Sequence, residues 1–244
     1  MRRIMLVLAY DGTNFYGYQV QNDDRTVQKV LQDALYNLTG EKIKSIASGR
    51  TDSGVHAQGQ VVHFDTNSTI PASKFKDALN SILDKDVRIL KSKQVKNDFH
   101  ARYDAKSKIY KYTIYNGDVE NPLNSRYTAF YPYKIDFDKI NDAIKEIVGT
   151  HDFKCFLASG SQVQNTVRTI DYIKVTKKAK TITFTIKGNG FLYNMVRIIV
   201  GTLLDVSQGR LTAQNVKDAI ELKSRKLCGK TMPPNGLCLY KVFY

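Results

Sequence analysis

Apolar residues recur along the first hundred positions with two spacings, one typical of strands and the other of helices. Strands are predicted where apolar and polar residues alternate or β-branched residues cluster. Helices are predicted where apolar residues fall three and four positions apart behind a capping residue such as Thr26. In chain order the predicted elements are a strand at 5–10, a helix at 26–38, strands at 43–47 and 60–65, a helix opening at Pro71 and a strand at 87–95. This β-α-β-β-α-β order is that of a ferredoxin-like domain, in which helices cover one face of an antiparallel sheet.

The second part of the chain returns to mixed strands and helices after an irregular stretch. Residues 116–133 hold two of the five prolines and are predicted to link two halves, 1–105 and 106–244. The elements predicted after residue 105 are a strand at 106–115, a helix at 136–148, a strand hairpin at 167–177 and 181–189, helices at 192–206 and 212–222, and a last alternating strand. The fold class predicted from this pattern is α+β.

The balance of charge narrows the choice of partners. Lys and Arg number 37 against 23 Asp and Glu, a formal net charge of +14. Such an excess favours a polyanionic partner, most simply nucleic acid, because cations placed at phosphates release condensed counterions. The chain also has 15 tyrosines; most are predicted to pack in strands, but exposed ones beside basic residues could stack on unpaired bases.

Cysteine usage and the longest apolar runs bear on location. Cys155, Cys228 and Cys238 are odd in number and lack a CxxC spacing, which fits reduced thiols. The apolar start is interrupted at Asp11, too soon for the core of a signal peptide. The longest apolar run, Ile198 to Leu204, is far shorter than a membrane span. We therefore expect a cytoplasmic protein without a membrane segment.

One loop stands out for its chemistry. Residues 49–57 read GRTDSGVHA and place a single carboxylate, Asp52, between two glycines and two predicted strands. Glycines let a loop turn tightly or approach a ligand closely, and loops on a rigid sheet often carry catalytic groups. A polar turn is the alternative, with Asp52 and Ser53 bonding their own backbone and Arg50 as an exposed charge. The residues alone leave both readings open.

A second unusual residue is Arg197, predicted in the middle of a helix that is apolar nearly all round. An unpaired buried guanidinium is costly, so it should have an acidic partner or line a wet cleft. Asp205, two turns further on, is poorly placed for this pairing. A distant carboxylate is expected, with Asp52 as the candidate; a structural salt bridge elsewhere is the alternative.

The motif GRTDSGVHA closely resembles the catalytic loop of the tRNA pseudouridine synthase A family, usually written GRTDAGVHA, with Ser53 as the one departure. Three later segments resemble that family in the same order: FHAR followed by the Y-x-Y of Tyr110, the stretch 188–201 around Arg197, and the ending PPNGLCL. An aromatic and glycine-bearing segment at 15–19 is also similar and is interpreted as support for the site. The resemblance covers nearly the whole chain.

The resemblance implies a pseudouridine synthase fold, with two ferredoxin-like halves sharing a mostly antiparallel sheet, helices outside and an RNA cleft between. It implies an isomerase that converts uridine to pseudouridine at positions 38–40 of the tRNA anticodon stem-loop. It further implies a homodimer that uses no cofactor and no metal.

The resemblance also implies roles for five residues. Asp52 would be the nucleophile, paired with Arg197, and Arg50 would help to hold the target nucleotide out of the RNA stack. Tyr110 would stack on the target base and is a candidate for proton removal late in the reaction. Leu237, matched ahead of Leu239, would line the base pocket. Whether Asp52 attacks C1′, attacks C6 or assists elimination stays open.

Two other classes of function are weighed against this one. A non-catalytic RNA-binding module would not require Asp52, Tyr110 and Arg197 together. A metal-dependent RNA nuclease could use Asp52, His56 and His63, but the spacing of the two histidines matches no standard metal motif.

Overall fold

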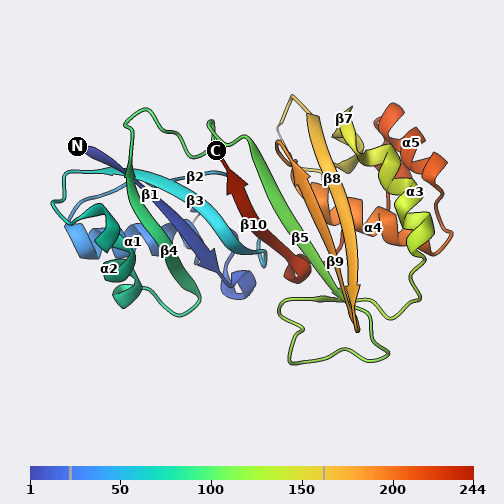
Figure 1. Cartoon of the computed structure of the whole chain (residues 1–244), viewed down its shortest axis with the longest axis horizontal. Coiled ribbons are helices and arrows are strands. Elements are labelled where there is room, and N and C mark those ends of the chain that lie inside the picture. Colours follow the sequence, from blue (N-terminus) through green and yellow to red (C-terminus); the bar gives the residue numbers. More distant parts are fainter. Residues whose placement is uncertain (22–23, 162) are drawn as a thin grey trace. The chain divides into compact units, whose positions relative to one another are not determined.

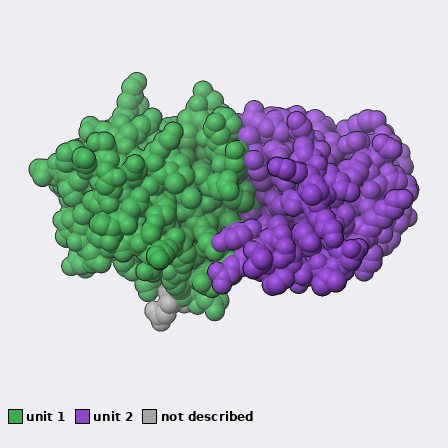
Figure 2. All heavy atoms as spheres, turned by 60° about the horizontal axis from the view of Figure 1, so that its bottom comes forward, with its two compact units in different colours: residues 1–106, 238–244 green, residues 107–237 purple. Residues whose placement is uncertain are grey.

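The computed structural model of the chain describes residues 1–21, 24–161 and 163–244. These residues divide into two compact units, one made of residues 1–106 and 238–244, the other of residues 107–237 (Figure 2). The last strand therefore belongs with the N-terminal unit, although the sequence placed it in the second half. Cys238 and Leu239 pair in parallel with His56 and Ala57. Local alternation cannot predict such a partner, because it carries no information about distant pairing.

The first unit has the predicted β-α-β-β-α-β order, with the terminal strand added to its sheet. Its sheet has β1 between β4 and β3 in antiparallel pairing, with β2 as a short partner of β3. Figure 1 shows α1 and α2 together on one side of these strands. The elements are β1 (Arg2–Tyr10), α1 (Val27–Thr39), β2 (Ile46–Ala47), β3 (His56–Thr66), α2 (Phe75–Ile82), β4 (Val87–Val95) and β10 (Leu237–Phe243), with short 3-10 turns at Gly12–Asn14 and Ala72–Lys74.

Local sequence explains where several of these elements begin and which face they bury. The Thr26 hydroxyl accepts a hydrogen bond from the backbone N–H of Lys29, which caps the first turn of α1 as predicted. On β1, the alternate residues Ile4, Leu6 and Leu8 are fully buried, as period-two alternation requires. The core of this unit thus lies between one face of the sheet and its two helices.

The second unit also combines strands with helices. Its strands run in the order β5, β9, β8 and β7, all antiparallel, and β6 pairs in parallel with β5. Figure 1 shows α3, α4 and α5 gathered beside this sheet. The elements are β5 (Ser107–Tyr115), β6 (Ala129–Phe130), α3 (Phe137–Ile147), β7 (Gly149–Asp152), β8 (Val167–Lys178), β9 (Thr181–Gly188), α4 (Met195–Ser207) and α5 (Ala213–Glu221), with 3-10 turns at Phe153–Phe156, Arg225–Leu227 and Pro234–Gly236.

The stretch predicted as a linker, residues 116–133, lies within the second unit instead. It contains β6, and the Asn235 amide donates to the backbone carbonyls of Ser125 and Thr128 at 2.6 and 2.9 Å. Its prolines and asparagines mark irregular chain correctly, but only these long-range bonds show where it belongs. Helix α4 is buried along nearly all its length, as its continuous apolar sequence predicts. Within the described residues, no helix combines the length and apolar character needed to cross a membrane.

Candidate active site

The loop that carries Asp52 connects β2 to β3, and its first residues are anchored to β3 by a buried side chain. The Ser48 hydroxyl donates to the Gln60 side-chain carbonyl at 2.7 Å, and the Gln60 amide donates to the carbonyl of Gly49 at 2.8 Å. Ser48 and Gln60 are both fully buried. Since buried polar groups are costly to leave unpaired, these bonds fix the point at which the chain leaves β2.

The second half of the loop is anchored by the segment that follows β1. The backbone N–H of Gly54 and the Ser53 hydroxyl both donate to the carbonyl of Phe15, at 3.3 and 3.2 Å. The backbone N–H of Tyr18 donates to the carbonyl of Thr51 at 3.0 Å. The segment at 15–19 therefore supports the loop directly. Ser53, the departure from the family motif, uses its hydroxyl for a contact that an alanine could not make.

Two glycines permit this arrangement. Gly54 has a φ of +75°, a left-handed backbone conformation that favours glycine. Gly12 lies so close to the loop that a Cβ atom built on it would stand 2.1 Å from the carbonyl oxygen of Val55. The turn after β1 and the Asp52 loop thus pack backbone against backbone.

The side chains of the loop divide between the interior and the surface. Thr51 is buried, and its hydroxyl is hydrogen-bonded to that of Tyr10 at 2.8 Å. Asp52 is half-buried and Arg50 is exposed. A carboxylate at the edge of solvent, with an exposed arginine two residues before it, is an arrangement that can meet a negatively charged polymer.

The two histidines considered as metal ligands are engaged in structural contacts. His56 Nδ1 accepts the backbone N–H of Gly12 at 2.9 Å, and His63 Nδ1 accepts that of Ala101 at 3.1 Å. Burial, with the charges of Arg3 and His100, lowers the pKa of His63 to about 4. Within the described residues, no group of three or more His, Cys, Asp or Glu side chains could hold a metal ion.

In the second unit, two tyrosines of β5 reach two other motifs. Tyr110 and Tyr112 are both buried on the same face of the strand, as the alternation predicts. The Tyr110 ring meets the edge of Phe191 with ring centres 5.0 Å apart. The Tyr112 hydroxyl donates to the carbonyl of Pro233 at 2.7 Å. Strand β5 therefore ties the 188–201 stretch and the PPNGLCL ending to one sheet.

Arg197 stands in the first turn of α4 rather than mid-helix, because the helix begins at Met195. Asn194, the residue before the helix, has a left-handed backbone with φ of 59°. The helix therefore does not extend back to Leu192, where the sequence predicts its start. The guanidinium donates to the carbonyl of Met232 at 2.6 Å and to the side-chain carbonyl of Asn194 at 2.5 Å.

These acceptors offset the unfavourable position of a cation at the positive end of a helix. Asp205, which the sequence judged poorly placed for Arg197, pairs with Arg210 at 2.6 Å.

The positive charge of Arg197 also affects the pKa of Tyr112 on β5. Burial raises the pKa of Tyr112, and the charge of Arg197 acts in the opposite direction. Gly236 lies against the Tyr112 ring, where a Cβ atom would stand 2.8 Å from it, and Leu237 follows as a buried residue. The second unit thus holds Tyr110, Arg197 and Leu237, with the charge of Arg197 acting on Tyr112 and Gly236, the residue before Leu237, against its ring. Asp52 and Arg50 belong to the first unit, and the pairing of Asp52 with Arg197 stays a prediction.

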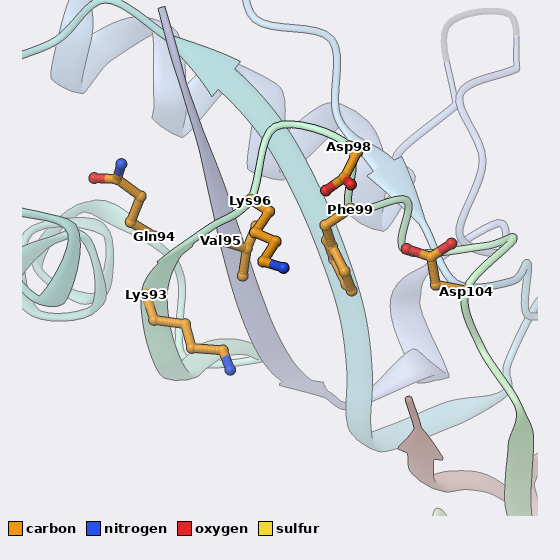
Figure 3. Close-up of a pocket in the computed structure, with 7 residues that line it drawn as sticks. All are labelled: Lys93, Gln94, Val95, Lys96, Asp98, Phe99 and Asp104. Carbon is orange, nitrogen blue, oxygen red and sulfur yellow. The ribbon is translucent and has the colours of Figure 1, made fainter.

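A depression of about 800 Å³ on the first unit lies beside the end of β4 and the segment after it (Figure 3). Lys93 and Lys96 lie on one side of it and Asp98 and Asp104 on the other, so its charge is mixed. None of the residues predicted for the site lines it. The residues around it are Lys93, Gln94, Val95, Lys96, Asp98, Phe99 and Asp104.

Sequence reasoning missed the residues that hold the Asp52 loop, namely Tyr10, Gly12, Ser48 and Gln60. The one local signal was Tyr10-Asp11-Gly12, an aromatic end to an aliphatic strand followed by a turn pair. Nothing in that signal indicates contact with a loop some forty residues further along the chain.

Comparison of the sequence with known proteins identifies the family of the chain. The family model described as tRNA pseudouridine synthase matches residues 6–104 and 143–244. Two relatives, from Acetivibrio thermocellus and Clostridium kluyveri, are both named tRNA pseudouridine synthase A. Each is 46% identical to this chain over 244 residues, and each alignment covers the full length of both proteins. A third, from Lacticaseibacillus casei, carries the same name and is 48% identical over 247 residues, again with complete coverage of both chains.

The family model and the full-length relatives thus define an isomerase of the pseudouridine synthase class. The chain belongs to the tRNA pseudouridine synthase A family. The resemblance found in the sequence is confirmed, and so is the α+β fold class.

Proposed function

We propose that this chain isomerises uridine to pseudouridine at positions 38–40 of the tRNA anticodon stem-loop, with Asp52 as the nucleophile. The observation that carries the proposal is the Asp52 loop itself. A half-buried carboxylate sits on a loop held from both sides by β3 and the segment after β1, in a chain of this family. Such support keeps a reacting group in place, which is how positioning contributes to rate.

The reaction sets requirements that the proposed residues can meet. The bond from ribose C1′ to uracil N1 breaks, the base turns, and C1′ joins C5. The C5 hydrogen leaves as a proton and N1 gains one, so the atoms balance without water or an oxidant. The target base must first leave the stack, and exposed Arg50 is placed on the loop to hold its nucleotide outside.

The remaining roles fall to residues of the second unit. Arg197 pairs with Asp52, and a carboxylate beside an arginine stays ionised. Tyr110 stacks on the target base, and Leu237 lines the pocket that retains the detached uracil. Two observations support a shared pocket wall: Tyr110 and Leu237 are both buried, and Gly236, the residue before Leu237, lies against the ring of Tyr112, which shares a face of β5 with Tyr110. The net charge of +14 supports tRNA as the partner.

Two further parts of the proposal come from the family resemblance and the composition. We infer a homodimer, which light scattering of the purified chain would test, with a monomer at micromolar concentration as the contradicting result. We also infer a cytoplasmic location, which is supported by three cysteines that form no disulfide.

The central test uses an unmodified tRNA transcript labelled with tritium at uridine C5, because that hydrogen is released when C5 joins C1′. Asp52→Asn is expected to bind the transcript and release no tritium. Asp33→Asn, an exposed residue of α1, is the matched control and should behave as wild type. Nearest-neighbour mapping then identifies the modified uridines. Full activity of Asp52→Asn would end the nucleophile assignment, and pseudouridine outside 38–40 would correct the target.

The same assay separates the two alternatives. A metal-dependent nuclease would cut the transcript and lose activity in EDTA, whereas the isomerase should leave the RNA intact and keep its rate. A binding module would retain tRNA and release no tritium even as wild type. The contacts of the two histidines count against the nuclease, because His56 and His63 each use Nδ1 to accept a backbone N–H.

A further inference from the structure

A hydrogen bond between the hydroxyls of Tyr10 and Thr51 joins strand β1 to the Asp52 loop. Tyr10 is the last residue of β1 and is 4% exposed; Thr51, the residue before Asp52, is 6% exposed. Their oxygens are 2.8 Å apart. Because both hydroxyls are buried, each loses a partner that water cannot easily replace if the other is removed.

This contact fixes the loop close to its reacting residue. The Ser48 and Gln60 bonds hold the loop at Gly49, and the Phe15 carbonyl holds it at Ser53 and Gly54. Between these anchors Arg50 points to solvent, and the Thr51 hydroxyl is bonded into the sheet. A threonine hydroxyl held by a strand residue limits rotation of the backbone that leads into Asp52.

The chemistry of Tyr10 suits a positioning role rather than a catalytic one. Burial raises the pKa of its phenol, so the group stays neutral and serves as a hydrogen-bond partner. Its ring forms part of the core of the first unit, so the hydroxyl is held by packing. The hydrogen bond from Tyr10 to Thr51 therefore anchors the loop to the rigid strand β1.

We propose that Tyr10 is a positioning residue for the isomerisation, holding the Asp52 carboxylate in its reactive orientation through the Tyr10–Thr51 hydroxyl contact. The proposal rests on the proposed role of Asp52. It predicts that the contact matters for the chemical step and much less for binding tRNA.

The test is a double-mutant cycle of Tyr10→Phe, Thr51→Val and the double variant. The readouts are the single-turnover rate of tritium release at saturating tRNA, the dissociation constant for tRNA, and the melting temperature. Each single variant is expected to lower the rate by about 10- to 100-fold, with tRNA binding changed less than threefold. The double variant should be no slower than the slower single variant, because both remove the same contact. Thr51→Ser keeps the hydroxyl and should recover most of the rate.

A control variant at another buried tyrosine distinguishes positioning from general loosening. The Tyr131 hydroxyl is also buried, and it donates to the carbonyl of Leu204 in the second unit at 3.5 Å. Tyr131→Phe removes a buried tyrosine hydroxyl far from the Asp52 loop in sequence and should leave the rate within twofold of wild type, with any loss of stability read from its melting temperature.

Three outcomes would overturn the proposal: a wild-type rate in Tyr10→Phe, additive losses in the double variant, or an equal loss of rate in Tyr131→Phe. Asp52→Asn, run in parallel, keeps the two proposals apart. If that variant is inactive while Tyr10→Phe is not, only the positioning role fails. If it retains full activity, the nucleophile assignment fails first.

Discussion

Replacing Gly12 by alanine should displace the Asp52 loop by a distance that the structure defines. A Cβ atom at this position would lie 2.1 Å from the carbonyl oxygen of Val55 and 2.5 Å from its carbonyl carbon. Ordinary van der Waals contact begins at 3.4 Å. The two backbones must therefore separate by about 1.3 Å, since the obstacle is main chain and cannot rotate away like a side chain.

Two consequences of that displacement can be given magnitudes. Overpacking of this kind costs about 1–3 kcal/mol of unfolding free energy. A shift of about 1 Å in a reacting group can cost about 100-fold in rate. The bond from Gly12 N–H to His56, now 2.9 Å, would be strained by the same movement. We expect Gly12→Ala to fold, to bind tRNA, and to release tritium about 100-fold more slowly than wild type.

The matched control is Gly40→Ala, at the C-terminal cap of α1. Gly40 has a φ of +71°, and a Cβ atom there would meet no atom within 4 Å. Alanine at that position costs about 1–2 kcal/mol through its left-handed backbone alone. Urea unfolding should thus show similar losses for both variants, while only Gly12→Ala loses single-turnover rate. A wild-type rate in Gly12→Ala would refute the reasoning, because it would mean that the close approach relaxes without moving the loop.

Three further predictions follow from other parts of the molecule. His63 is held neutral with its pKa at about 4, below the 6.5 of the unfolded chain; the free energy of unfolding should therefore fall as pH drops from 6.5 to 4, and urea titrations of His63→Gln should lack that part of the slope. Tyr112→Phe leaves the Pro233 carbonyl without its buried donor and should cost about 1–2 kcal/mol in the same unfolding assay, with no loss refuting a structural role for the bond. Binding of tRNA should weaken with salt, with a log–log slope of about −0.7 to −0.9 per phosphate contact, and an affinity insensitive to salt would show that the positive charge serves another purpose.

The parts of the fold that could be predicted are those fixed by local chemistry. β4 runs from Val87 to Val95 in both prediction and structure. Thr26 accepts the capping hydrogen bond predicted for it, and Asp136 and Thr212 cap α3 and α5 in the same way. In each case the information lies within a few residues, in an alternating strand or in a side chain that satisfies the first turn of a helix.

The parts that could not be predicted depend on distant partners or on a single backbone torsion. β10 joins the first unit through its pairing with β3, and residues 116–133 join the second through Asn235. β2 shortens to Ile46–Ala47, although its sequence alternates from residue 43. Arg197 moves from mid-helix to the first turn because Asn194 adopts a left-handed conformation, which asparagine tolerates better than most residues.

The same distinction separates the residues of the Asp52 loop by what constrains them. Thr51 is held by Tyr10, Gly54 by its positive φ, and His56 by the Gly12 N–H, so contacts within the first unit constrain each of these residues. Arg50 is exposed, and an exposed arginine contributes little to stability by itself. Its place beside a half-buried carboxylate is better explained by a negatively charged partner. A loop whose buried positions are fixed by contacts with the first unit, and whose exposed cation is not, is the arrangement expected where a rigid sheet presents a few groups to RNA.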